Sequence, residues 1–372
     1  MTLEKQMPGR PKCFSSPSGG PAPHGGGLGG ALVRDVHRIQ PWLQSPLRAS
    51  VLAAAVLLAS CGGGTAQVEA FKPNRLIAFG DESSLLEDFV DTTGVHDGYK
   101  YGINDRSSGN AGKCLVDPTV AQLVASHYGF VFSQCNPNTE TPRAFIQAQR
   151  LATVDDPSLG LAQQRANLPD LGPKDMTTVM IGSNDIIELY ERTLIGMTRA
   201  VAVAEAQRRG GHAAEQVNAI LATGARALVM TVPNLGVSPY AATANQTNPG
   251  ASALLNDLTV EFNAYLRTRI DSAKYDGRNY GLVLADDIVS AMARTPASFL
   301  NSPAITNAAA CHMPDVITAD SAATAALACD SSALVSGAVS ASHLWATDRH
   351  LGPNAHNRIG SQAASRASSN PF

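Results

Sequence analysis

Short runs of consecutive apolar residues alternate along this chain with longer segments in which apolar residues recur at helical spacing. Continuous apolar runs that end in glycine turns are typical of strands buried on both faces of a parallel sheet. Apolar residues that recur every three or four positions are typical of helices that cover such a sheet. The alternation of the two patterns therefore predicts an α/β fold with a parallel sheet between helical layers.

The predicted strands are 75–79, 175–181, 227–232 and 280–285, and the predicted helices are 116–128, 185–205, 213–223, 254–270 and 356–368. The polar segment 133–142 is expected to be a loop, and 208–211 a helix end. Two strands end in glycine turns, at Gly80 and Gly182. Because sites in open α/β sheets lie at the carboxyl ends of the strands, these two turns mark the expected functional site.

The first sixty residues do not follow the α/β pattern. Residues 1–30 are rich in Gly, Pro and Ser without a hydrophobic period, which indicates disorder. Arg48 then precedes a short apolar run at 51–59, the order of a secretory signal peptide. Residues 1–40 are long for the basic region of a signal peptide, so either the true start lies later or the leader is unusual. We expect 1–60 to be leader and signal peptide.

The run Leu58-Ala59-Ser60-Cys61 matches the lipobox of bacterial lipoproteins, in which the cysteine is lipidated and becomes the mature N-terminus. Several acyl chains on one cysteine give stable membrane anchoring. Gly62 after the cysteine favours the outer membrane of the bacterial cell envelope. The alternatives are a signal cut without lipidation, or a buried apolar helix. We expect a lipidated N-terminus and linker at 61–73 and a single domain at 74–372.

Composition narrows the class of protein. Of 372 residues, 44% are hydrophobic and 16% charged, which suits a folded core rather than global disorder. The chain has 28 basic and 31 acidic residues, and six basic but only two acidic residues precede Cys61, so the remainder is acidic. Nucleic acid is therefore not an expected partner, since phosphate binding needs clustered positive charge.

Four cysteines remain after the predicted leader and anchor: Cys114, Cys135, Cys311 and Cys329. An even number in an oxidising compartment favours disulfides, and four cysteines allow three connectivities. We choose the sequence-local pairs, Cys114–Cys135 and Cys311–Cys329. The rival, a metal site, lacks the close Cys or His spacing that zinc sites use, so no metal is expected.

Three short motifs, two of them at predicted strand ends and one near the C-terminus, follow one another in an order that carries a specific resemblance. They are Gly80-Asp81-Glu82-Ser83-Ser84, Gly182-Ser183-Asn184-Asp185 and Thr347-Asp348-Arg349-His350-Leu351-Gly352. With them, the chain from about 74 to 362 resembles the GDSL (SGNH) hydrolases, a family of esterases and lipases. The resemblance implies a three-layer α/β/α sandwich with a parallel, flavodoxin-like sheet, a Ser-His-Asp site and no cofactor.

In such a site an activated hydroxyl attacks the ester carbonyl and a histidine accepts its proton. The resemblance assigns the base to His350, and the oxyanion donor to Asn184 in the intact block that Gly182 opens. In a second block near 143–150, Ala148 stands in place of a glycine. The backbone N–H of Ala148 would still be able to donate to the oxyanion. Asp81 is expected either to cap the turn or to order the site.

The first and last blocks depart from the family pattern. Glu82 holds the nucleophile position, and a one-residue shift of the turn would present the hydroxyl of Ser83 instead. Alternatively, Glu82 and His350 form an acid–base pair, or the site is inactive. Thr347 holds the position of the orienting aspartate, and a similar shift would let Asp348 orient His350.

Two function classes follow. The first is a membrane-anchored hydrolase of carboxylic esters, acting as a monomer on a small-molecule or lipid ester, with Ser83 as nucleophile and Asp348 orienting His350. The second is a non-catalytic envelope lipoprotein that keeps the fold as a binding module, which Glu82 and Thr347 favour.

Overall fold

The computed structural model describes residues 70–105, 112–275, 278–313 and 319–368. The predicted leader, signal peptide and Cys61 lie outside these residues. Within them, no helix is long and apolar enough to cross a membrane. No group of three or more His, Cys, Asp or Glu side chains in the described segments is placed to hold a metal ion.

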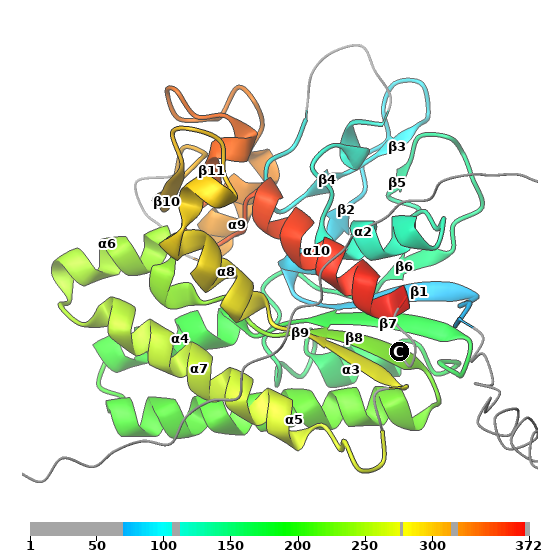
Figure 1. The fold of residues 1–372 in the computed structure, drawn as a ribbon, viewed down its shortest axis with the longest axis horizontal. Helices are drawn as coiled ribbons and strands as arrows, with labels where there is room; N and C mark the ends of the chain where they lie inside the picture. The colour runs from blue at the N-terminus through cyan, green and yellow to red at the C-terminus, as the bar shows by residue number, and fades with distance from the viewer. Residues whose placement is uncertain (1–69, 106–111, 276–277, 314–318, 369–372) are drawn as a thin grey trace, which may run out of the picture. The chain divides into compact units, whose positions relative to one another are not determined.

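A five-stranded parallel sheet forms the centre of the fold, in the order β6-β1-β7-β8-β9 (Figure 1). Its strands are β1 (Arg75–Gly80), β6 (Ala144–Ile146), β7 (Asp175–Met180), β8 (Arg226–Met230) and β9 (Tyr280–Val283). The four predicted strands are confirmed. The pattern missed β6, because three residues between polar loops are too few to show a period.

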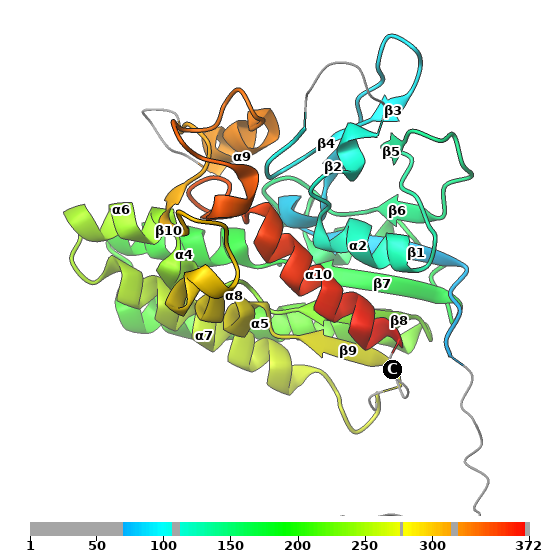
Figure 2. The same cartoon turned by 45° about the horizontal axis from the view of Figure 1, so that its top comes forward.

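Helices cover both faces of the sheet (Figures 1 and 2). One face carries α2 (Val120–His127), α8 (Ala285–Arg294) and α10 (Pro353–Ser368), and the other carries α3 (Leu161–Ala166), α4 (Ser183–Leu194), α5 (Arg199–Ala222) and α7 (Ala251–Arg269). This is the predicted three-layer α/β/α sandwich with a flavodoxin-like strand order.

Shorter elements complete the described chain. They are α6 (Pro239–Thr247), α9 (Ala319–Ala328), the strand pairs β2 (Leu86–Glu87) with β4 (Tyr99–Lys100), β3 (His96–Asp97) with β5 (Cys135–Asn136) and β10 (Ile305–Ala309) with β11 (His343–Trp345), and the 3-10 turns η1 (Glu82–Ser84), η2 (Lys113–Leu115), η3 (Leu235–Val237), η4 (Pro296–Ser298) and η5 (Ser340–Ser342).

The prediction placed one helix break wrongly. The chain breaks after α4, where Gly196 has a φ of 114°, and α5 then continues through the 208–211 segment that we expected to end a helix. Gly210 is required inside α5, since a Cβ there would lie 2.2 Å from the backbone oxygen of Phe262 in α7. The glycine therefore permits close helix packing, which sequence alone cannot distinguish from a helix stop.

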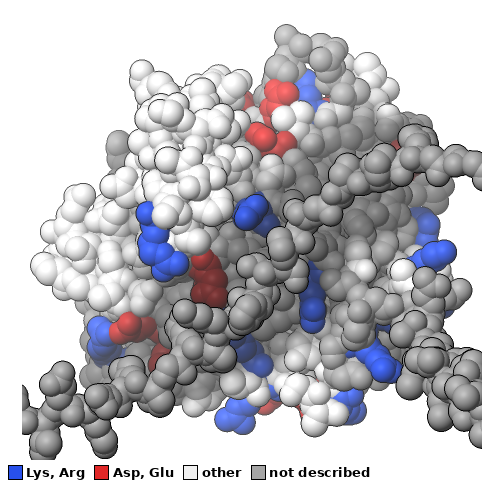
Figure 3. Space-filling view, viewed as in Figure 1, with Lys and Arg blue, Asp and Glu red and all other residues white. Residues whose placement is uncertain are grey.

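Both predicted disulfides are present. Cys114–Cys135 joins η2 to β5, and Cys311–Cys329 joins the segment after β10 to the residue that follows α9. Their Cα–Cα separations of 5.7 and 5.8 Å are usual for disulfides. On the face seen in Figure 3, basic and acidic side chains lie scattered among uncharged ones.

Candidate active site

Two glycine turns bring the first two motifs, which begin at Gly80 and Gly182, together at the ends of β1 and β7. Gly80 has a φ of 136°, and a Cβ there would lie 1.9 Å from the Met180 carbonyl oxygen. Gly182 has a φ of 123°, and a Cβ there would lie 2.6 Å from the Val232 side chain. Only glycine combines these backbone angles with such close approach. The turns thus place η1 next to the start of α4, where Asn184 lies.

The carboxylate of Glu82 lies at the centre of this site. Its Oε2 accepts hydrogen bonds from Asn184 Nδ2 at 3.0 Å and from the backbone N–H of Leu151 at 2.9 Å. Its Oε1 lies 3.3 Å from His350 Nε2. Glu82 is only 4% exposed. Burial by itself raises the pKa of Glu82, but the hydrogen bond and charge of His350 outweigh it, so the pKa lies below its ordinary value.

The side chain of Glu82 therefore occupies Asn184, the side-chain donor that the resemblance assigned to an oxyanion. Asn184 also donates to the carbonyl oxygen of Ala152 at 3.2 Å, so its Nδ2 donates two hydrogen bonds. Of the alternatives left open by the sequence, a paired Glu82 and His350 is the arrangement that the structure contains.

The backbone donor is Leu151, not the predicted Ala148. The N–H of Ala148 instead bonds the carbonyl of Ala78, in a strand-like contact beside β1. Leu151 has a φ of 60°, which is rare for a bulky residue and disfavoured by about 1–3 kcal/mol. Nothing in the sequence marks this donor, because leucine rarely adopts a left-handed backbone.

His350 contacts Thr347 on its other side. The Thr347 Oγ1 lies 2.7 Å from His350 Nδ1, and both residues are buried. The side chains of Glu82, His350 and Thr347 thus form a continuous line of contacts. Glu82 and His350 are 268 positions apart in the sequence, and Thr347 and His350 are 3 positions apart. The imidazole has a partner on each nitrogen.

The structure does not bring Asp348 to His350. Both carboxylate oxygens of Asp348 bond the Arg349 guanidinium, at 3.1 and 2.9 Å. Arg349 in turn lies 4.6 Å from the ring centroid of Tyr240. The turn is not shifted as we expected, because Thr347 accepts the backbone N–H of His350 at 3.1 Å and holds it in place.

Ser83 lies in η1 beside Glu82 and is half-buried. Its backbone N–H donates to Asp81 Oδ1 at 3.0 Å, which makes Asp81 the cap of this turn. Since Glu82 occupies the contact with His350 Nε2, the predicted shift that would give Ser83 this contact is absent. The predicted capping role of Asp81 is present.

Asp81 is buried, and its Oδ2 has no hydrogen-bond partner among the described residues. Burial and the neighbouring charge of Glu82 raise its pKa to about 8. A raised carboxyl pKa contributes stability that is complete below the unfolded value and is lost as pH rises toward 8. The folded protein therefore holds this carboxyl protonated at neutral pH.

Asp81→Asn keeps the cap but cannot ionise. We expect its unfolding free energy to match the parent near pH 4 and to exceed it increasingly toward pH 8, by up to about 1.4 kcal/mol per pH unit. Urea unfolding across this range measures the difference. A difference in unfolding free energy between Asp81→Asn and the parent that does not change with pH would contradict a protonated Asp81.

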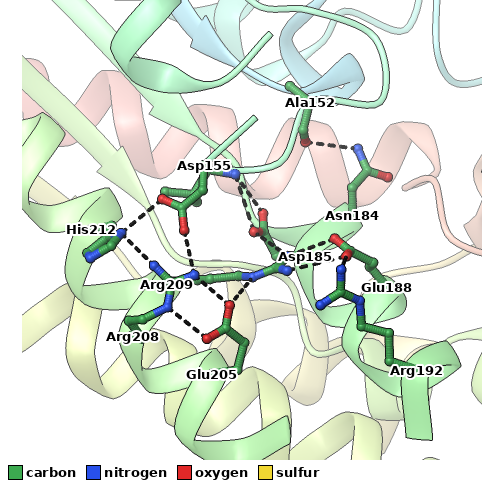
Figure 4. Close-up of polar contacts among 11 residues, drawn as sticks. Ala152, Asp155, Asn184, Asp185, Glu188, Arg192, Glu205, Arg208, Arg209 and His212 are labelled. Carbon is green, nitrogen blue, oxygen red and sulfur yellow. Dashed lines mark hydrogen bonds and ion pairs between the residues drawn. The ribbon is translucent and has the colours of Figure 1, made fainter. Parts of the chain in front are cut away.

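A buried ion pair supports the loop that carries Leu151 (Figure 4). Asp185 accepts the backbone N–H of Val154 at 3.0 Å and pairs with Arg209 of α5 at 3.1 Å. Arg209 also bonds Glu188 and Glu205. Burial raises the pKa of Asp185 to about 6 against the opposing charge of Arg209. Asp185, the last residue of the second motif, thus anchors the loop and takes no part in the Glu82–His350 contact.

An apolar cluster lies beside the Glu82–His350 contact. It consists of Tyr101, Ala323 and Ala326, with Leu85, Leu151 and Leu327 packed against it. The Tyr101 ring centroid is 6.3 Å from that of His350. Arg150, next to Leu151, bonds Asp320 and Thr324 of α9. These contacts hold α9 against the loop that donates to Glu82.

The parallel α/β/α sandwich thus carries a polar site at the ends of β1 and β7. Residues 60–330 match the model of the GDSL-like Lipase/Acylhydrolase family. The chain therefore belongs to this family, whose members are hydrolases of the esterase and lipase type. Thr347 and His350 lie beyond the matched residues, and the fold brings them to the site.

No curated protein matches the chain. A solved crystal structure aligns with 79% of this chain and 96% of its own, at 13% identity and a TM-score of 0.38. This likeness is too low to carry an argument about function.

Proposed function

We propose that this chain hydrolyses carboxylic esters with Glu82, rather than Ser83, as the reacting group. The observation that carries the proposal is the set of contacts of the Glu82 carboxylate, which stands at the family's nucleophile position against His350 Nε2. The depressed pKa keeps this carboxylate ionised at neutral pH. An ionised carboxylate is an acceptor and a base.

The simplest balanced reaction uses a water molecule. Glu82 takes one proton from water while the hydroxide attacks the acyl carbon, and the ester C–O bond then breaks. The same proton passes from Glu82 to the departing alkoxide, which leaves an acid, an alcohol and the original carboxylate. Asn184, Leu151 and His350 hold the carboxylate in one orientation throughout. Because a carboxylate of low pKa is a weak base, slow turnover is expected.

The test is hydrolysis of short-chain p-nitrophenyl esters by the full chain. Glu82→Gln should abolish turnover, because the amide cannot accept the proton. Ser83→Ala should retain it, and a fluorophosphonate should label no serine. Loss of activity in Ser83→Ala together with labelling of the parent would instead establish the serine route that the sequence suggested.

A second function class is favoured by one further observation. The hydrogen-bond donors of the site are all engaged by the protein itself, and Glu82, Asn184 and His350 are at most 8% exposed. A closed site of this kind suits a binding module that has given up ester cleavage. No turnover in the parent, with the fold intact by circular dichroism, would favour this alternative.

We also propose that the protein is anchored to the bacterial cell envelope, in the outer membrane, through lipidated Cys61. The support is the order of Arg48, the apolar run 51–59 and the small residues before Cys61. Expression with a labelled fatty acid tests it: the parent should carry label and enter the detergent phase. Cys61→Ser should do neither, and equal labelling of both would refute the anchor.

A further inference from the structure

The hydroxyl of Thr347 is surrounded by groups that fix the direction of its hydrogen. Its oxygen accepts the backbone N–H of His350 at 3.1 Å and that of Arg349 at 3.4 Å. His350 Nδ1 is the third neighbour, at 2.7 Å. Thr347 is fully buried. The described structure thus places two donors and one ring nitrogen around a single hydroxyl.

A hydroxyl oxygen has two lone pairs and one hydrogen. The two backbone N–H groups use both lone pairs, so the hydrogen is left for Nδ1, which must then accept it. We propose that Thr347 is a positioning residue that makes Nδ1 of His350 the acceptor and puts the ring proton on Nε2. In a neutral imidazole one nitrogen carries the proton and the other accepts.

Glu82 requires the same proton position. Its Oε1 faces Nε2, and an ionised carboxylate only accepts hydrogen bonds. The Thr347 hydroxyl therefore donates its hydrogen bond to Nδ1, and Nε2–H donates to Glu82. A Ser-His-Asp site runs the other way, with Nδ1–H donating to the aspartate and Nε2 accepting from the serine.

The replacements at the two ends of the site are thus a matched pair. Threonine can donate a hydrogen bond to Nδ1, which an ionised aspartate cannot do. Glutamate can accept a hydrogen bond from a protonated Nε2, whereas a histidine that acts as base for a serine needs a lone pair on Nε2. The inference concerns the site of the proposed function and rests on it for its biological meaning. Its geometry holds whether or not the site turns over an ester.

Nitrogen NMR of the full chain labelled with ¹⁵N-histidine reads the proton positions directly, with His350→Asn used to assign the signals. At a pH where the His350 ring is neutral, its Nδ1 signal should lie at the position of an unprotonated ring nitrogen and its Nε2 signal at that of a protonated one. A neutral ring with the proton on Nδ1 in the parent would overturn the proposal without bearing on ester turnover.

Variants at Thr347 separate the hydroxyl from a merely structural role. Thr347→Ser retains the donor and should keep the parent pattern. Thr347→Asp can only accept, so Nδ1 should become protonated. Thr178→Val is the matched control, because Thr178 is equally buried and its hydroxyl has no hydrogen-bond partner in the part of the chain that the structure describes. An unprotonated Nδ1 in Thr347→Asp, or a changed pattern in Thr347→Ser, would also overturn the proposal.

Discussion

Glu82→Ser combined with Thr347→Asp is expected to produce a serine esterase activity that neither replacement produces alone. The double variant restores a hydroxyl against Nε2 and an acceptor against Nδ1, so the ring proton moves to Nδ1 and Nε2 becomes a base. Removing the longer Glu82 side chain also frees Asn184 and the Leu151 N–H to bind an oxyanion. The truncated side chain leaves room for a small acyl group.

The size of the difference follows from the cost of the wrong tautomer. In a serine protease triad, loss of the aspartate acceptor lowers kcat by about 10⁴-fold. We therefore expect kcat/KM of the double variant to exceed that of Glu82→Ser by about 10³–10⁴-fold on short p-nitrophenyl esters. Only the double variant should react rapidly with a fluorophosphonate.

Asp348 provides the control for this comparison. Its carboxylate bonds Arg349 rather than His350, so adding Asp348→Asn to the double variant should leave most of the gained activity. If Glu82→Ser alone matched the double variant, and Asp348→Asn abolished that activity, then Asp348 rather than residue 347 would orient the base.

Arg209→Met is expected to lower the unfolding free energy by about 3–5 kcal/mol, because it leaves the buried carboxylate of Asp185 without its counter-charge. Methionine retains the apolar part of the arginine stem, so the loss of charge dominates. Urea unfolding measures the effect. Arg208→Met is the matched control: this neighbouring arginine is exposed and its ion pairs lie at the surface, so the loss should stay below about 1 kcal/mol.

The pH dependence of this variant has a definite sign. Without Arg209, the pKa of Asp185 rises further above its present value of about 6. A carboxyl with a raised folded pKa loses its contribution as pH rises, so the deficit should be largest above pH 6 and shrink in acid. Adding Asp185→Asn should recover much of the loss. Equal losses in Arg208→Met and Arg209→Met would contradict the assignment of a buried pair.

Much of the fold was predictable because its signals are local. The apolar runs at β1, β7, β8 and β9 are long enough to show that both faces of each strand are covered. The disulfide pairs followed from closeness in the sequence. Short or packing-dependent features were not predictable: β6 is three residues long, and Gly210 serves a contact with a helix some fifty residues away.

The sequence by itself determined the residue types of the site: a glutamate after β1, an asparagine after β7, and a threonine and histidine near the C-terminus. Only the tertiary structure decided which of them meet. In the fold, Glu82 rather than Ser83 contacts His350 Nε2, and Thr347 rather than Asp348 contacts Nδ1. The backbone N–H of Leu151 donates to Glu82. The physical reason is that hydrogen bonds are directional and short. A shift of one residue in a turn changes every partner, and the angles of that turn are set by packing across the sheet.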